Sequence, residues 1–189
     1  MAISPVVNTT GIEQQVAVQQ VNSQNIQNQT SLDVEQNVSP SLSNQLEAGQ
    51  SVSDYLKEIS PGISPDELAI YENAGLKVEE VGDRICLNRQ DIDWDYKDPN
   101  GMTNRERMEN GLSPLNKDGL PYELHHVGQK NDAPLAELTH SEHMSPENNK
   151  TLHPIRTGSE VDHGYSWKDI REDHWKARAE QFEQQYYGV

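Results

Sequence analysis

The sequence has few of the residues that form disulfides, membrane spans or large packed cores. Its 189 residues contain one cysteine, Cys86, which excludes an internal disulfide and a cysteine-rich zinc site. No apolar run approaches the roughly 20 residues that cross a bilayer, and the N-terminus lacks the basic and apolar segments of a cleaved secretory signal. Because only 33% of residues are hydrophobic and 6% aromatic, we expect part of the chain to lie outside any core.

Positive charge is also scarce. The chain has 15 Lys and Arg against 31 Asp and Glu, a net charge of −16, which at first sight argues against nucleic-acid binding. The deficit is uneven, since residues 1–83 hold two basic and twelve acidic residues whereas residues 84–189 hold thirteen and nineteen. A metal ion and locally grouped Arg or Lys could bind phosphate in the second part, although its composition promises no strong affinity for duplex DNA.

Composition changes along the chain and predicts three segments. Residues 1–50 contain sixteen Gln or Asn and no Lys, Arg or aromatic residue, which is typical of a disordered polar leader. Residues 51–87 form either a small adaptor or the beginning of the catalytic domain, and the sequence favours neither. Residues 88–189 are expected to form the catalytic domain itself.

Capping and turn motifs predict a fold with both helices and strands after residue 50. Ser64-Pro65-Asp66-Glu67 offers an N-cap serine, a proline at the first helical position and a glutamate at the third, and Gly75 can end that helix. Gly82-Asp83 separates two apolar-rich segments and predicts a tight hairpin over residues 76–87. Thr103-Asn104-Arg105-Glu106 is a capping box that opens a short helix ended by Gly111.

The second half predicts a strand pair and two further helices. Residues 122–127 resemble a strand whose partner is residues 134–138, and Lys117-Asp118-Gly119 forms a turn before it. Ser145-Pro146-Glu147-Asn148 is typical of a helix start. Aromatic and apolar residues recur at helical spacing over residues 166–187, so we expect a long helix that covers the core rather than a platform for stacking bases.

Histidines gather in one region. Five of the seven lie between positions 125 and 153. His125 and His126 are adjacent, and successive side chains of a strand point to opposite faces, so one imidazole can hold a metal while the other activates water. His143 and His153, from a following loop and helix, could complete the metal shell, with a coordination position left for water and substrate.

Plainer interpretations of these histidines stay open. A histidine pair on a strand is more often incidental than catalytic, and His140 and His143 could be an exposed polar pair beside a helix start. His163 and His174 are expected to be scaffold residues. The sequence contains no His-Glu-x-x-His, Pro-Cys-x-x-Cys, Gly-rich phosphate loop or Gly-x-Ser-x-Gly motif, which argues against zinc proteases, deaminases, P-loop enzymes and serine hydrolases.

Several short motifs follow one another in a fixed order between about residues 88 and 180. They are Thr103 to Met108, Gly111 to Pro114, Glu123 to Gln129, Pro134 to Thr139, Glu142-His143 and Leu152-His153. Together they resemble the LHH toxin nucleases of the HNH/endonuclease VII superfamily. The resemblance implies an α+β fold of the ββα-metal type, in which a hairpin and a helix hold one divalent cation such as Mg²⁺ or Zn²⁺, and DNA cleavage as the usual activity.

The resemblance also implies roles for six residues. His125 would bind the metal, His126 would be the general base, and His143 and His153 would be further ligands. Glu123 and Gln129 would orient the histidine pair. The chain departs from the expected pattern at Met102 and Met144, where basic residues are common in such nucleases, and both changes remove charge that could bind phosphate.

The resemblance further implies a secreted antibacterial effector that is exported without a cleavable signal peptide. Dedicated secretion machinery or a chaperone would assist its export. The effector would be delivered into the cytoplasm of a target cell without inserting into the membrane. A cognate immunity protein would block its site. Two alternatives remain at this point: a catalytically idle binding or regulatory protein with the same fold, and an RNase built on the same site.

Overall fold

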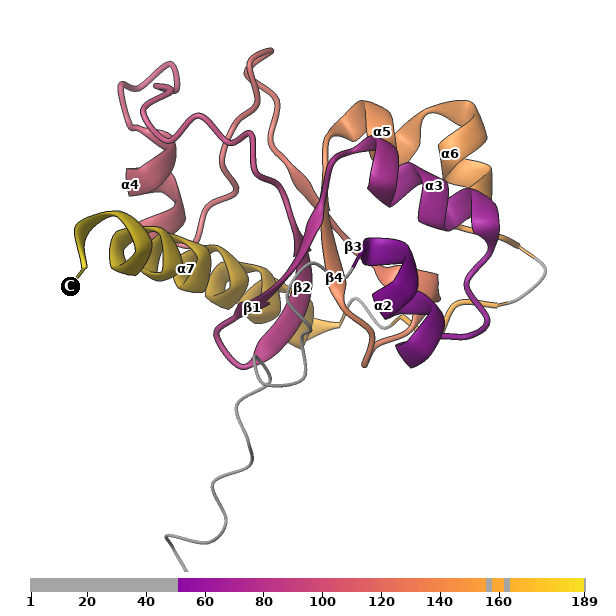
Figure 1. The fold of residues 1–189 in the computed structure, drawn as a ribbon. Helices are drawn as coiled ribbons and strands as arrows, with labels where there is room; N and C mark the ends of the chain where they lie inside the picture. Colours follow the sequence, from indigo (N-terminus) through magenta and orange to yellow (C-terminus); the bar gives the residue numbers. More distant parts are fainter. Residues whose placement is uncertain (1–50, 156–157, 162–163, 189) are drawn as a thin grey trace, which may run out of the picture. The chain divides into compact units, whose positions relative to one another are not determined.

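A computed structural model of the chain describes residues 51–155, 158–161 and 164–188 (Figure 1). The predicted leader at residues 1–50 and the predicted scaffold residue His163 lie outside this part. The helices are α2 (Val52–Ile59), α3 (Pro65–Asn73), α4 (Asn104–Glu109), α5 (His140–Met144), α6 (Pro146–Leu152) and α7 (Tyr165–Tyr187). The strands are β1 (Lys77–Val81), β2 (Arg84–Asn88), β3 (Glu123–His126) and β4 (Leu135–Leu138). The predicted α+β class is confirmed.

The four strands form one sheet in the order β1-β2-β4-β3. β1 and β2 are the predicted antiparallel hairpin, closed over Gly82-Asp83 with Val81 opposite Arg84. β3 and β4 are antiparallel, with His126 opposite Leu135, and the helices α5 and α6 follow them, so this half of the sheet has the expected ββα order. β2 pairs with β4 in parallel and joins the first hairpin to the second.

Helices cover both faces of the sheet (Figure 1). Helices α2, α3 and α6 pack on one face, where Leu56, Tyr71 and Leu152 share a core with Leu138 of β4. Helices α4 and α7 pack on the other face, in a second core that includes Leu135. Because side chains alternate along a strand, β2 contributes Leu87 to the first core and Cys86 to the second, and β4 likewise contributes Ala136 and Leu135.

The predicted helix boundaries follow from local capping. The Ser64 hydroxyl accepts a hydrogen bond from the Glu67 amide at 3.1 Å, and Gly75 after the helix has φ +66°. The capping box at Thr103 forms, and Gly111 takes φ +72° beyond α4. Among the helices of the described part, none is long and apolar enough to span a membrane.

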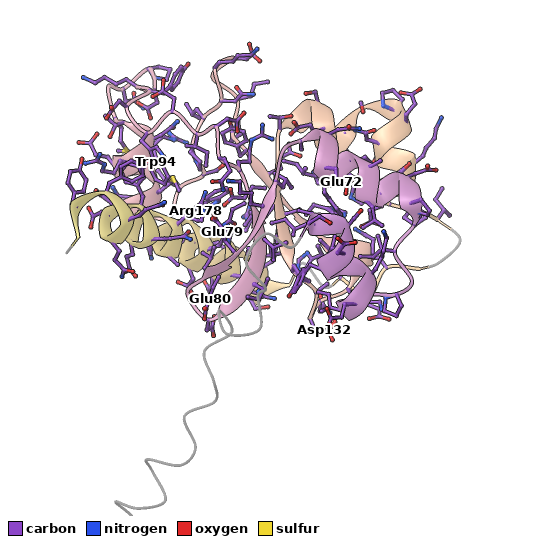
Figure 2. The ribbon with its side chains drawn as sticks, viewed as in Figure 1. Glu72, Glu79, Glu80, Trp94, Asp132 and Arg178 are labelled. Atoms are coloured by element: carbon purple, nitrogen blue, oxygen red, sulfur yellow. The ribbon has the colours of Figure 1, made fainter. Side chains whose placement is uncertain are left out.

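A buried ion-pair network attaches α7 to the sheet. Glu137 of β4 is fully buried and accepts hydrogen bonds from the Arg89 amide at 2.8 Å, the His174 Nε2 at 2.9 Å and the Arg178 Nε at 2.8 Å. The guanidinium of Arg178 also lies 5.9 Å from the ring centre of Trp94. Figure 2 labels both residues near α7. His174 therefore has a scaffold role, as its sequence context predicts.

Candidate metal centre

Three imidazoles converge at the end of the second hairpin. His125 comes from β3, His143 from α5 and His153 from the residue after α6, and each can offer a nitrogen such that all three nitrogens lie within 4.8 Å of one another. The ring centres are 4.9 to 5.2 Å apart. These are the three residues predicted as metal ligands, and the structure brings them together.

Local structure explains how α5 and α6 present their histidines. A capping box between Thr139 and Glu142 fixes the start of α5 and places His143 in its last turn. Only Ser145 separates α5 from α6, because Pro146 begins the next helix. The expectation that His143 belongs to a loop is therefore wrong, since both it and His153 are positioned by short helices.

The spacing of one nitrogen pair fits a tetrahedral metal site. His125 Nδ1 lies 3.2 Å from His143 Nε2. Two nitrogens at about 2.0–2.1 Å from a tetrahedral zinc ion would be about 3.3 Å apart. Three imidazoles also leave one coordination position for water or substrate, as catalytic zinc sites do. The donor set therefore fits a borderline divalent metal.

Two of the clustered imidazoles, those of His143 and His153, form hydrogen bonds through Nδ1. The Nδ1 of His143 lies 2.6 Å from Glu123 Oε2, and the Nδ1 of His153 lies 3.3 Å from the Asn149 carbonyl oxygen. A proton on the Nδ1 of His143 satisfies Glu123, and the Nε2 of the same ring then faces the cluster with the lone pair that a metal needs. Glu123 thus contacts His143, and also His140 at 2.7 Å, rather than the histidine pair that it was expected to orient.

The surroundings of His143 favour its neutral imidazole. Burial lowers the pKa of His143, and although the hydrogen bond with Glu123 opposes this effect, the neighbouring imidazoles of His125 and His153 add to it, so the pKa lies below its ordinary value. Burial raises the pKa of Glu123, but its hydrogen bonds with His140 and His143 outweigh that and hold the pKa below the usual range. Metal ligands must be deprotonated imidazoles, so these shifts suit a metal site.

His126 lies on the opposite face of the sheet, as strand alternation predicts. It is 4% exposed, and its ring centre is 4.6 Å from that of Trp167 in α7. Gln129 has a left-handed backbone, φ +57°, and its carbonyl accepts a hydrogen bond from the Glu160 amide. In the described part of the chain, no hydrogen bond joins its side chain to His125. The base role of His126 and the orienting role of Gln129 stay predictions.

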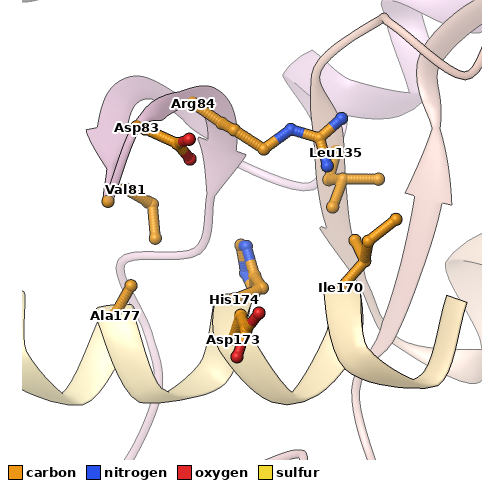
Figure 3. A pocket seen from close by; sticks show the side chains of 9 residues that line it. Val81, Asp83, Arg84, Leu135, Ile170, Asp173, His174 and Ala177 are labelled. Atoms are coloured by element: carbon orange, nitrogen blue, oxygen red, sulfur yellow. The ribbon is translucent and has the colours of Figure 1, made fainter. Parts of the chain in front are cut away.

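A groove of about 620 Å³ runs along the edge strand β3 beside the cluster. It is lined by Glu123 and His143 from the metal centre and by Trp167 with the cations Lys168 and Arg171 from α7. A second cavity, of about 450 Å³, lies between the β1–β2 hairpin and α7 (Figure 3). Its one imidazole, His174, is already bonded to Glu137, so this cavity lacks a ligand set of the same kind.

Sequence reasoning missed one acidic side chain at the centre. Glu67 of α3 is 4% exposed, and its Oε1 lies 3.9 Å from His125 Nε2. The sequence identifies Glu67 only as the third residue of a capped helix. Nothing in its local pattern indicates a contact with a strand far along the chain, so only the folded structure could reveal it.

A family model described as a nuclease of the HNH/ENDO VII superfamily with conserved LHH matches residues 103–181. The matched segment contains Leu124-His125-His126 and the other two clustered histidines, His143 and His153. It excludes α2, α3 and the β1–β2 hairpin. No solved structure matches the chain.

Proposed function

Since the model of the LHH nucleases of the HNH/ENDO VII superfamily matches residues 103–181, we propose that this chain is such a nuclease and hydrolyses DNA with one divalent metal ion held by His125, His143 and His153. The observation that carries the proposal is the convergence of these three imidazoles, with ligand nitrogens within 4.8 Å of one another. Mg²⁺, Zn²⁺ and similar ions are the candidates, and imidazole donors favour Zn²⁺ and other transition metals over Mg²⁺.

Each residue has a distinct task in the proposed reaction. A bound ion would stabilise negative charge on the scissile phosphate and on the leaving oxygen. His126 would accept the proton of the water that attacks phosphorus as the phosphorus–oxygen bond to the leaving group breaks. Glu123 would hold His143 in the tautomer that leaves Nε2 free for the metal.

The substrate would lie in the groove along β3. Lys168 and Arg171 provide cations beside His143, where a phosphate backbone could pass. Lys168 also pairs with Glu172 at 3.2 Å, so binding phosphate would compete with an existing ion pair. With a net charge of −16 and two cations lining the groove, we expect weak binding with a shallow salt dependence, because the slope grows with the number of phosphates that the protein neutralises.

The same resemblance leads us to propose a biological setting. The chain would be a secreted antibacterial effector, delivered into a target cell by secretion machinery and neutralised by an immunity protein that covers the groove. Expression in a bacterial cytoplasm should then arrest growth with loss of chromosomal DNA. Expression of His126→Ala should leave growth and DNA intact, and arrest by that variant would contradict a nuclease cause.

A cleavage assay tests the enzymatic proposal directly. Purified protein is incubated with plasmid DNA or total RNA in the presence of Mg²⁺, Zn²⁺ or EDTA, beside His126→Ala. We expect metal-dependent loss of DNA, with a fall of at least about 100-fold in the variant, because a general base typically contributes 10²–10⁴. The variant should still bind metal, because its side chain lies on the other face of β3 from the cluster.

Three results would redirect the proposal. Cleavage of RNA alone would make the protein an RNase. Metal binding without cleavage of either nucleic acid would favour the idle binding or regulatory protein. A fully active His126→Ala would remove that residue from the base role.

A further inference from the structure

Helix α3 carries a carboxylate to the rear of the metal centre. Glu67 Oε1 accepts a hydrogen bond from the Tyr71 hydroxyl at 2.6 Å and another from the Gly128 amide at 2.7 Å. A buried carboxylate is costly unless such donors satisfy it. These two hydrogen bonds hold the Glu67 carboxylate in one position.

The His125 imidazole faces Glu67 through its Nε2 atom. His125 is 2% exposed, its Nδ1 faces His143, and among the described residues its buried Nε2 has no hydrogen-bond partner. If Nδ1 binds the metal, Nε2 must carry the proton. The nearby Glu67 oxygen, at 3.9 Å, is too distant for a hydrogen bond in this state but lies where an acceptor is required.

The other two imidazoles each have a hydrogen-bond acceptor behind them. Glu123 stands behind His143 and the Asn149 carbonyl stands behind His153. Metal-bound histidines ordinarily donate their second N–H to such an acceptor, which fixes the ring and raises its basicity. We propose that Glu67 is the positioning residue for His125, accepting the Nε2 proton when Nδ1 holds the metal. This inference rests on the proposed metal site.

The proposal gives α3 a share in the centre although it lies outside the segment that the family model matches. A purely structural role would need only an acceptor for the Gly128 amide and the Tyr71 hydroxyl. The amide oxygen of Glu67→Gln could still accept from both, whereas the negative charge facing His125 would be lost. Glu67→Gln therefore separates positioning from scaffolding.

Zinc affinity of the full chain provides the first test, measured by competition with a chromophoric chelator. Glu67→Gln should weaken Zn²⁺ binding by about 10–100-fold, as for other outer carboxylates behind metal-bound histidines, with the melting temperature of the metal-free protein unchanged. Asp66→Asn, an exposed neighbour in the same helix, is the matched control and should bind as the unaltered chain does. Unaltered affinity in Glu67→Gln, with binding lost in His143→Ala, would overturn the positioning role alone.

Nitrogen-15 NMR of the unaltered, zinc-loaded chain provides the second test and needs no variant to fold. We expect the His125 ring to bind zinc through Nδ1 and to retain a slowly exchanging, hydrogen-bonded proton on Nε2. Ligation through Nε2 would overturn the inference while preserving the metal site. Failure of the unaltered chain to bind Zn²⁺, Co²⁺, Mn²⁺ or Mg²⁺ would instead overturn the proposed function.

Discussion

At the scale of single residues, Glu123 is shared between two histidines of unequal importance. Its Oε2 lies 2.6 Å from the Nδ1 of His143, whose other nitrogen faces the cluster, and its Oε1 lies 2.7 Å from the Nδ1 of His140. The His140 side chain is 60% exposed and outside the cluster. An ion pair at such an exposed site contributes little. Glu123 therefore matters to the metal through His143 alone.

Replacing Glu123 should separate affinity from pH dependence. We expect Glu123→Gln to weaken Zn²⁺ binding at neutral pH by about 10–100-fold, because His143 loses the negatively charged partner that orients it and raises its basicity. Glu123 also raises the pKa of His143 against the effect of burial. Without it that pKa falls further, so the loss of binding on acidification should begin at a lower pH. Zinc titrations from about pH 5 to pH 8, the range in which histidine titrates, measure both effects.

His140→Ala is the matched control for this prediction. It removes the other partner of Glu123 but leaves the three clustered imidazoles in place, so Zn²⁺ affinity should stay within about fivefold, as for an exposed pair worth under about 1 kcal/mol. Equal losses in His140→Ala and Glu123→Gln would mean that His140, and not the orientation of His143, governs binding.

At the scale of elements, the position of α7 depends on one buried carboxylate. Burial would raise the pKa of Glu137, but the charge of Arg178 and the hydrogen bond with His174 lower it from 4.5 to about 2. A lowered pKa stabilises the fold above the unfolded-state value, and this stabilisation is lost as pH falls from about 4.5 towards 2. Acid should therefore release α7 from the sheet.

The Glu137→Gln variant tests whether Glu137 causes this loss of stability in acid. It leaves the Arg178 charge buried without its partner, which typically costs about 3–5 kcal/mol of unfolding free energy at neutral pH. The variant should also lose stability less steeply below pH 4.5, because its side chain cannot be protonated. Urea unfolding at several pH values measures both. Glu72→Gln, at an exposed position on α3, should reproduce the unaltered profile; a parallel profile for Glu137→Gln would assign the acid sensitivity to other groups.

Local signals in the sequence predict elements well, and contacts between distant elements poorly. The capping motifs at Ser64 and Thr103 and the Gly82-Asp83 turn each act over a few residues, and the structure confirms all three. Sequence analysis predicts no helix over Val52–Ile59, although Ser51 caps one and Val52, Tyr55 and Leu56 follow helical spacing. A helix of eight residues is marginal on its own and depends on packing against the rest of the domain.

The candidate site shows the same division. The histidine string and its resemblance to a nuclease family predict the residues that cluster. By contrast, the approach of Glu67 to His125 depends on the parallel pairing of β2 with β4 and on the packing of α3 against α6, and neither leaves a local signature. The Glu137 network joins three segments that are far apart in the sequence, so the sequence does not predict it either.

At the scale of the whole molecule, residues 51–87 are integrated with the residues that follow. β2 lies between β1 and β4 in the sheet and is hydrogen-bonded to both. Val52, Leu56 and Tyr71 supply much of the core that Leu138 and Leu152 share. Burying each large apolar side chain stabilises by about 1.5–3 kcal/mol, and whole domains are stable by only about 5–15 kcal/mol. We infer that the catalytic domain begins near residue 51 rather than at residue 88.

Truncation tests this inference. A chain that lacks residues 1–87 should show no cooperative thermal unfolding and no Zn²⁺ binding, because it loses two strands, the core residues of α2 and α3, and Glu67. A chain that lacks only residues 1–50 is the control, and it should unfold cooperatively and bind Zn²⁺ as the full chain does, since every described contact of the metal centre lies beyond residue 50. Calorimetry and chelator competition measure the two properties. Cooperative unfolding and full zinc affinity in residues 88–189 would instead make residues 51–87 a separate adaptor.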